Sequence, residues 1–148
     1  LSRGELTPYL AAHATLDVTL VDGRTDEAVG ASDASLVKSG TSTLEAGLML
    51  RPLVVVYKLS WLSYLVGRLL VRITYFSLVN LLVGRRVVPE LLQGGASAEA
   101  MAAEVLALLP EGPARAAQLE GLREVRASLG EPGAPERVAH VVSEVMDA

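Results

Sequence analysis

The stretch Ser39-Gly40-Thr41-Ser42-Thr43-Leu44-Glu45 follows the short apolar run 34–38 and leads into an apolar segment compatible with an α-helix. Small polar residues in this position predict a strand, a tight turn and a helix N-terminus. Such a junction directs several backbone N–H groups and the positive end of the helix dipole toward one point. The stretch therefore predicts an α/β unit with a place for a phosphate or pyrophosphate.

The side chains of this turn add polar groups to the backbone amides. Gly40 lets a ligand approach the backbone closely, and Glu45, one turn into the helix, can accept hydrogen bonds from hydroxyl groups. Amides for phosphates and a carboxylate for a ribose suggest a nucleotide, but the same pattern describes an ordinary capped helix whose Glu faces solvent. The hydroxyls that can add donors are those of Ser39, Thr41, Ser42 and Thr43.

Strands and helices are predicted to alternate in the first part of the chain. We expect strands at 16–21, 34–38 and 52–59, separated by helices at 25–29 and 41–50. The third strand is apolar on both faces, which is typical of a parallel sheet covered by helices. The order predicts βαβ units, with ligands beyond the carboxyl ends of the strands, where the turn would lie.

The second half of the chain is predicted to be mainly helical. Residues 74–84 begin as a strand and continue as a loop, in which Asn80 is the one strongly polar side chain. A buried amide needs a partner, either a structural backbone group or a ligand. We assign 1–133 to one α/β domain and 134–148 to a C-terminal helical segment. Helices are expected at 89–93, 97–109, 114–129 and 136–146.

The net charge of −4 is distributed unevenly along the 148 residues. No acidic residue lies between Glu45 and Glu90, whereas six basic residues do. This segregation predicts that 46–89 faces an anion such as a phosphate, a nucleic acid or a lipid surface. Nucleic acid is disfavoured because the chain is acidic overall and offers few aromatic side chains for stacking. The six basic residues are Arg51, Lys58, Arg68, Arg72, Arg85 and Arg86.

Residues 61–73 form the most apolar stretch of the chain. A glycine and two arginines interrupt it, and its uncharged part is shorter than the ~20 residues of a transmembrane helix. As a helix it aligns a tryptophan, a tyrosine and both arginines on one face, which suits a membrane interface or an anionic lipid. A core helix whose arginines extend to solvent fits the same pattern. The aligned residues are Trp61, Tyr64, Arg68 and Arg72.

Several kinds of site are excluded or disfavoured. The chain has no cysteine, so disulfides and cysteine metal sites are excluded. His13 and His140 lie far apart without ligand spacing, so we predict no metal site. Neither a P-loop nor a dinucleotide-binding glycine motif is present. Because the chain begins at Leu1 and shows no signal-peptide pattern, we expect it to be a fragment of a longer protein.

The order of segments resembles the lipid-A-disaccharide synthase family, glycosyltransferases with two Rossmann-like domains (GT-B type). The most specific motifs are S-G-T-x-T-L-E at 39–45 and S-L-x-N-L-L-x-G-R at 77–85, and the resemblance runs from about residue 16 to the end. It implies a Rossmann-like parallel sheet with flanking helices, the C-terminal, nucleotide-sugar-binding half of such an enzyme. Further matching stretches are 31–34, 51–57 and 89–93.

This resemblance implies transfer of 2,3-diacylglucosamine from its UDP derivative to 2,3-diacylglucosamine 1-phosphate, without a metal ion or other cofactor. The turn 39–43 would then face the pyrophosphate, Glu45 the ribose hydroxyls, and Asn80 with Arg85 the diphosphate or the reacting sugar. The catalytic base of the family is an Asp of the N-terminal domain, which has no counterpart here. We therefore expect no catalytic residue in this chain and no turnover by it alone.

The resemblance also implies a bacterial cytoplasmic enzyme, peripheral on the inner face of the inner membrane. We expect residues 134–148 to cross to the other domain or to be exchanged between the chains of a homodimer. A hypothesis of another class is a peripheral module that binds anionic lipid, in which 58–73 is the functional surface and the turn is structural. A purely structural α/β domain is the third interpretation.

Overall fold

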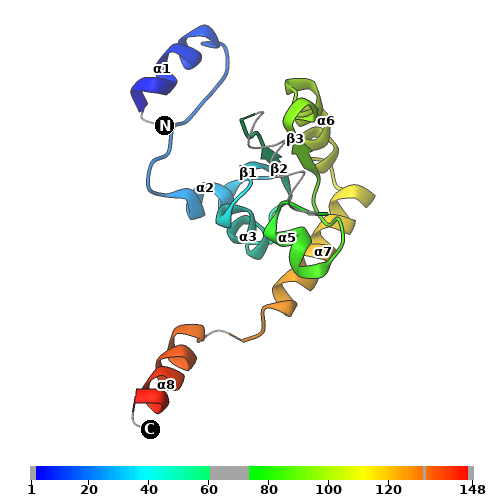
Figure 1. Ribbon diagram of the computed structural model, residues 1–148. Helices are drawn as coiled ribbons and strands as arrows, with labels where there is room; N and C mark the ends of the chain where they lie inside the picture. The colour runs from blue at the N-terminus through cyan, green and yellow to red at the C-terminus, as the bar shows by residue number, and fades with distance from the viewer. Residues whose placement is uncertain (1–2, 61–73, 132, 147–148) are drawn as a thin grey trace.

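The computed structural model describes residues 3–60, 74–131 and 133–146. Its centre is a parallel three-stranded sheet in the order β1 (Ser35–Lys38), β2 (Leu53–Tyr57), β3 (Glu90–Leu92) (Figure 1). Helices flank this open sheet, as in a Rossmann-like domain. The predicted fold class is therefore confirmed.

Helices connect and cover the strands. α3 (Thr41–Leu48) joins β1 to β2, α5 (Leu78–Val83) precedes β3, and the 3-10 helix η1 (Gln93–Gly95) follows it. α3, α5 and α7 contact one another, while α6 contacts β1 and β2 from the opposite face. The remaining described helices are α1 (Arg3–Ala12), α2 (Thr25–Ala31), α6 (Ala98–Leu108), α7 (Pro113–Ser128) and α8 (Ala134–Met146).

The hydrophobic core lies on the face of the sheet covered by α3, α5 and α7. Side chains alternate along a strand, so Val37 of β1 and Leu53 and Val55 of β2 point to this face. Gln118 of α7 ties the helix to the sheet, because its amide accepts from Leu53 N (2.8 Å) and donates to Leu53 O (3.1 Å). The core is completed by Ala46, Val79, Val88, Leu122 and Val125.

Most predicted elements of the α/β region are confirmed with shifted ends. The strands expected at 34–38 and 52–59 are β1 and β2, and the helices expected at 25–29 and 41–50 are α2 and α3. The helix expected from residue 97 is α6, and Ser97 caps it by accepting from Ala100 N (3.1 Å). Local sequence patterns were sufficient for these elements.

The strand predicted at 16–21 is wrong. These residues form no helix or strand, and apolar side chains of the segment are exposed, Leu16 by 63%. Within the described residues β1 pairs only with β2, so the segment has no neighbouring strand to hold it. A lone extended segment cannot satisfy its backbone groups, whatever its alternation.

The predictions for 74–84 and 89–93 are also wrong. Residues 78–83 form helix α5, because Ser77 caps it by accepting from Asn80 N. Residues 90–92 form strand β3, because Leu91 and its neighbours pair with the central strand β2. Long-range pairing overrides the local preference in the second case.

The terminal helices lie apart from the sheet (Figure 1). Neither α1 nor α8 contains a buried residue. The helix expected at 136–146 corresponds to α8, and its exposed valines make it amphipathic. Among the described elements, the packed part of the fold is therefore the sheet with α2, α3, α5, α6 and α7.

Gly121 of α7 provides a test of this packing. A Cβ at this position would lie 2.6 Å from Val87 Cγ1, whereas one at Gly30 of α2 would meet no described atom within 4 Å. Both substitutions increase helix propensity, so a difference in stability between the two variants measures the cost of the steric clash at Gly121. We expect Gly121→Ala to be less stable than Gly30→Ala by about 1–3 kcal/mol in urea unfolding. Equal stability of the two variants would show that α7 does not pack closely against Val87.

Candidate functional site

The turn 39–43 lies at the carboxyl end of β1, where it enters α3. Ser39 N donates to Val56 O (2.9 Å) and so continues the pairing of β1 with β2. Gly40 is the N-cap of α3, and no side-chain hydrogen bond caps this helix. A Cβ at Gly40 would meet no described atom within 4 Å. Among the described residues, the space next to Gly40 is therefore open.

The four hydroxyls of the turn fall into two pairs. Ser39 Oγ donates to Phe76 O (3.0 Å), and Thr43 Oγ1, in a fully buried side chain, donates to Gly40 O (2.7 Å). These two hydroxyls stabilise the turn from within. Thr41 and Ser42 are exposed at its surface. The hydroxyl groups of Thr41 and Ser42 are thus accessible from solvent.

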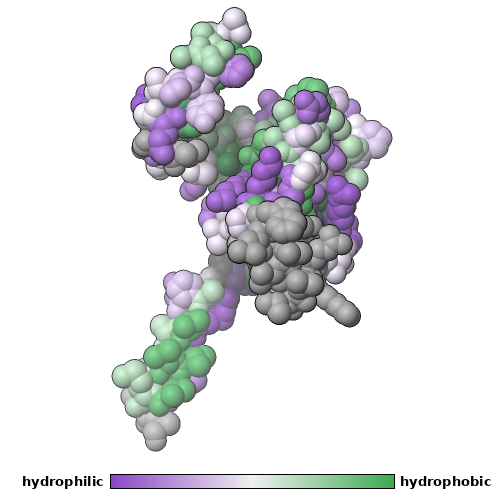
Figure 2. All heavy atoms as spheres, turned by 45° about the horizontal axis from the view of Figure 1, so that its top comes forward, coloured by the Kyte–Doolittle hydropathy of each residue, from purple (hydrophilic) through white to green (hydrophobic). Residues whose placement is uncertain are grey.

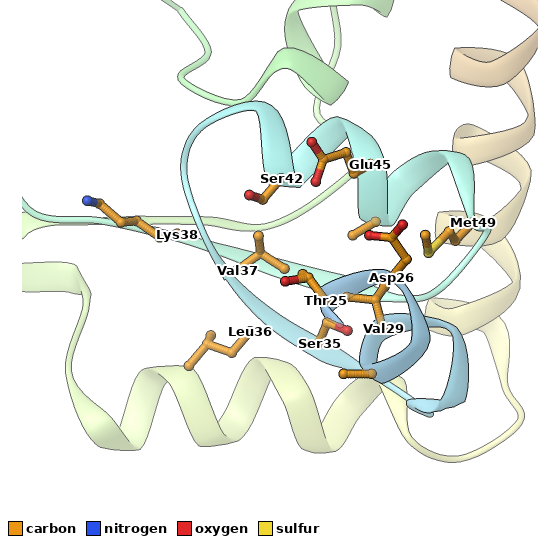
Figure 3. A pocket seen from close by; sticks show the side chains of 12 residues that line it. Thr25, Asp26, Val29, Ser35, Leu36, Val37, Lys38, Ser42, Glu45 and Met49 are labelled. Atoms are coloured by element: carbon orange, nitrogen blue, oxygen red, sulfur yellow. The ribbon is translucent and has the colours of Figure 1, made fainter. Parts of the chain in front are cut away.

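A pocket of about 410 Å³ lies beside the turn, between α2, β1 and α3 (Figure 3). Figure 3 shows Ser42 and Glu45 projecting from the same side of α3, with Asp26 of α2 also at the pocket. An apolar surface with a few polar groups is typical of small-molecule sites. The apolar lining includes Val29, Leu36, Val37, Ala46 and Met49.

Asp26 was not predicted as a site residue. The sequence shows it only as one of the acidic residues at the start of a short helix, where aspartate is common in any protein. Its place in the pocket depends on how α2 packs against α3. No local sequence pattern predicts that packing. By contrast, the placement of Ser42 and Glu45 on one side of α3 follows from their spacing along the helix.

Asn80 is fully buried, and its side chain makes four hydrogen bonds. Its Oδ1 accepts from Val87 N (2.7 Å) and Val88 N (2.9 Å). Its Nδ2 donates to Val88 O (3.0 Å) and to the Glu90 carboxylate (2.8 Å). Each polar atom of its amide thus has structural partners among the described residues.

Glu90, at the start of β3, is a residue that sequence reasoning missed. Its carboxylate accepts hydrogen bonds from Phe76 N, from Ser77 N and Oγ, and from Asn80 Nδ2. All three partners precede it by 10 to 14 positions. The only sequence signal is that Glu90 is the first acidic residue after the acid-free stretch.

Arg85 does not join the turn 39–43. The loop that carries Arg85 leads to the amino end of β3, whereas the turn follows the carboxyl end of β1. Because the strands are parallel, these two positions lie at opposite ends of the sheet. Arg85 forms an ion pair with Glu124 of α7 instead. The structure thus unites the turn with Glu45 and separates both from Arg85.

The predicted lipid-facing residues Trp61, Tyr64, Arg68 and Arg72 lie outside the described residues. In the three described ranges, no helix has both the length and the hydropathy to cross a bilayer.

The Asn80 network makes a testable contribution to stability. Asn80→Ala leaves Val87 N, Val88 N and Val88 O without their side-chain partner in a buried setting. We expect the free energy of unfolding to fall by about 3 kcal/mol in urea titration. Leu81→Ala, an exposed position on the same helix, should change it by less than about 0.5 kcal/mol. Similar values for the two variants would contradict the structural role of Asn80.

Comparison with known proteins relates the whole chain to one family. A family model described as lipid-A-disaccharide synthetase matches residues 6–142. The chain is 72% identical over 146 residues to the lipid-A-disaccharide synthase of Anaeromyxobacter dehalogenans strain 2CP-1, 50% over 146 residues to that of Myxococcus xanthus and 43% over 147 residues to that of Geobacter sulfurreducens. Each match covers 99% of this chain and 38% of the relative. The chain therefore belongs to the lipid-A-disaccharide synthetase family and spans about 38% of the length of these relatives.

Proposed function

We propose that the protein containing this chain is a lipid-A-disaccharide synthase. Its reaction transfers 2,3-diacylglucosamine from the UDP derivative to 2,3-diacylglucosamine 1-phosphate and releases UDP. The relatives that match 99% of the chain bear that enzyme name. Within it, this chain binds the UDP donor. The observation that carries this assignment is the uncapped N-terminus of α3 beside the pocket lined by Ser42 and Glu45.

The spacing along α3 suits a nucleoside diphosphate. The amides at Thr41 and Ser42 and their exposed hydroxyls donate to the diphosphate at the positive end of the helix dipole. Glu45 lies three positions after Ser42, a rise of about 4.5 Å along the helix axis. Its exposed carboxylate accepts hydrogen bonds from the ribose hydroxyls in the pocket. Groups on one side of α3 thus bind both the diphosphate and the ribose.

This arrangement stabilises the departing UDP. Negative charge develops on the diphosphate as the sugar leaves, and preorganised N–H and O–H donors stabilise it without reorganisation. Ser39 and Thr43 support the turn from within, and Asn80 and Arg85 hold the neighbouring loop and helix through their internal bonds. We place the catalytic base outside this chain, which contributes donor binding rather than proton transfer.

The substrates carry acyl chains, so we further propose contact with the cytoplasmic face of the inner membrane through 61–73. The support is the charge pattern, since the chain carries no acidic residue from 46 to 89. Basic residues beside a tryptophan favour an anionic lipid surface. The turn and this segment then bind two parts of the same donor, its nucleotide and its lipid.

We propose that α8 serves as a docking element, either to another domain of the same protein or to a second copy of the chain. Figure 2 shows hydrophobic residues gathered along this helix. An amphipathic helix with an exposed apolar face is stabilised when a partner covers that face. The exposed apolar residues of α8 include Val138, Val141, Val142, Val145 and Met146.

Glu45 provides the direct test of the donor site. In the full-length protein, Glu45→Ala should weaken UDP binding about tenfold in calorimetry, because the ribose hydroxyls lose a charged acceptor. Glu120→Ala, which removes an exposed carboxylate of α7, is the matched control and should leave the affinity unchanged. An unaltered dissociation constant for Glu45→Ala would remove Glu45 from the ribose role.

Membrane contact is tested separately with vesicles that contain anionic phospholipid. The double variant Arg68→Glu/Arg72→Glu should lose most of its co-sedimentation, since each basic residue near such a surface contributes about 1 kcal/mol. Arg123→Glu on α7 is the control for charge reversal elsewhere. Equal sedimentation of the double variant and the unmodified protein would count against this surface.

A further inference from the structure

Among the described helices, α3 and α5 begin close together near the carboxyl end of the sheet, and their N-termini differ. α3 begins at Thr41 and has no side-chain cap, whereas α5 begins at Leu78 and is capped by Ser77. The two beginnings are neighbours, because Ser39 Oγ donates to Phe76 O (3.0 Å). Glu90 is bonded to the start of α5 and, through Phe76, is linked to the turn before α3.

The Glu90 carboxylate occupies the N-terminus of α5. Its Oε1 accepts from Ser77 N (2.9 Å), Ser77 Oγ (2.7 Å) and Asn80 Nδ2 (2.8 Å). Its Oε2 accepts from Phe76 N (2.9 Å). A carboxylate offers about four acceptor positions, so these bonds use its capacity. Glu90 thereby provides partners for the N–H groups of Phe76 and Ser77, which directly precede the helix.

Phe76 connects Glu90 to the turn. Its N–H donates to Glu90 Oε2, and its carbonyl accepts from Ser39 Oγ, the residue directly before Gly40. Its ring lies against that of Tyr57, the last residue of β2, with the ring centroids 6.3 Å apart. Phe76 is therefore fixed on three sides. A displacement of its backbone would move the Ser39 hydroxyl and, with it, the start of α3.

We propose that Glu90 is a positioning residue of the donor site, which holds the diphosphate-binding turn in place through Phe76 and Ser39. This inference rests on the proposed binding of UDP at the turn. Glu90 touches no substrate in this role. It is bonded to the start of α5, and it holds Phe76, whose carbonyl accepts the hydrogen bond of Ser39 Oγ beside the turn.

Glu90→Gln separates this role from general stability. The amide oxygen of Gln can keep the three bonds that Oε1 accepts, and the cap of α5 by Ser77 does not involve Glu90. Its NH2 group replaces Oε2 and meets Phe76 N, where two donors face each other. The substitution therefore loosens Phe76 selectively.

The experiment uses the full-length protein, with UDP as the probe in calorimetry and steady-state kinetics with both sugar substrates. We expect Glu90→Gln to raise the dissociation constant of UDP and the KM of the UDP donor about fivefold, as for one weakened charged hydrogen bond. The KM of the acceptor should stay within about twofold, because the proposal assigns only the donor to the turn. Glu120→Gln, on the exposed surface of α7, is the matched control.

A double-mutant cycle tests the route through Phe76. Ser39→Ala breaks the other end of the link while leaving every Glu90 bond intact, so it remains informative even if Glu90→Gln unfolds. Ser39→Ala alone should weaken UDP binding, and the double variant should be no weaker than the weaker single variant. Additive effects, or unchanged UDP affinity in a folded Glu90→Gln protein, would overturn the positioning role.

The outcomes also separate this inference from the proposed function. Absence of UDP binding by the unmodified protein would overturn both. UDP binding that is weakened by Glu45→Ala and unaffected by Glu90→Gln and Ser39→Ala would leave the donor site standing and remove only the role of Glu90.

Discussion

The parallel pairing of β2 with both β1 and β3 is the constraint on which the rest of the structure depends. Leu53, Val54 and Val55 are fully buried, so the central strand must be covered on both faces and along both edges. In a parallel sheet the carboxyl ends of all strands lie at the same end of the sheet. The turn after β1 lies at the carboxyl end of the sheet, and the loop of Arg85 lies at its amino end. The direction of the strands thus decides which predicted site residues meet.

The two neighbouring helix N-termini of α3 and α5 differ in how their polar groups are bonded. Both offer backbone N–H groups and a positive dipole end. At α5 the chain supplies its own anion, the carboxylate of Glu90, together with the Ser77 cap. At α3 the side chains of Ser39 and Thr43 bond to carbonyls and leave the N-terminus uncapped. In the proposed function, the diphosphate binds at this uncapped N-terminus of α3.

The sequence allowed the region from 25 to 59 to be predicted because its signals are local. The apolar run of β2, the polar turn and the spacing from Ser42 to Glu45 all lie within one or two elements. The prediction of a strand at 16–21 was wrong because alternation of apolar and polar residues does not by itself provide a neighbouring strand. β3 and the role of Glu90 depend on partners in β2 and α5, so nothing near Glu90 in the sequence could reveal them.

The position of α3 explains why the candidate site is preformed. The buried face of this helix carries Thr43, Ala46 and Gly47, and a Cβ at Gly47 would lie 3.1 Å from Val79 and 3.3 Å from Leu122. The adjacent side of the helix presents Ser42 and Glu45 to the pocket. Because core packing fixes the helix, it also fixes the spacing between the groups proposed for diphosphate and ribose. A nucleotide bound there would order few protein groups, and the entropic cost of binding would be correspondingly low.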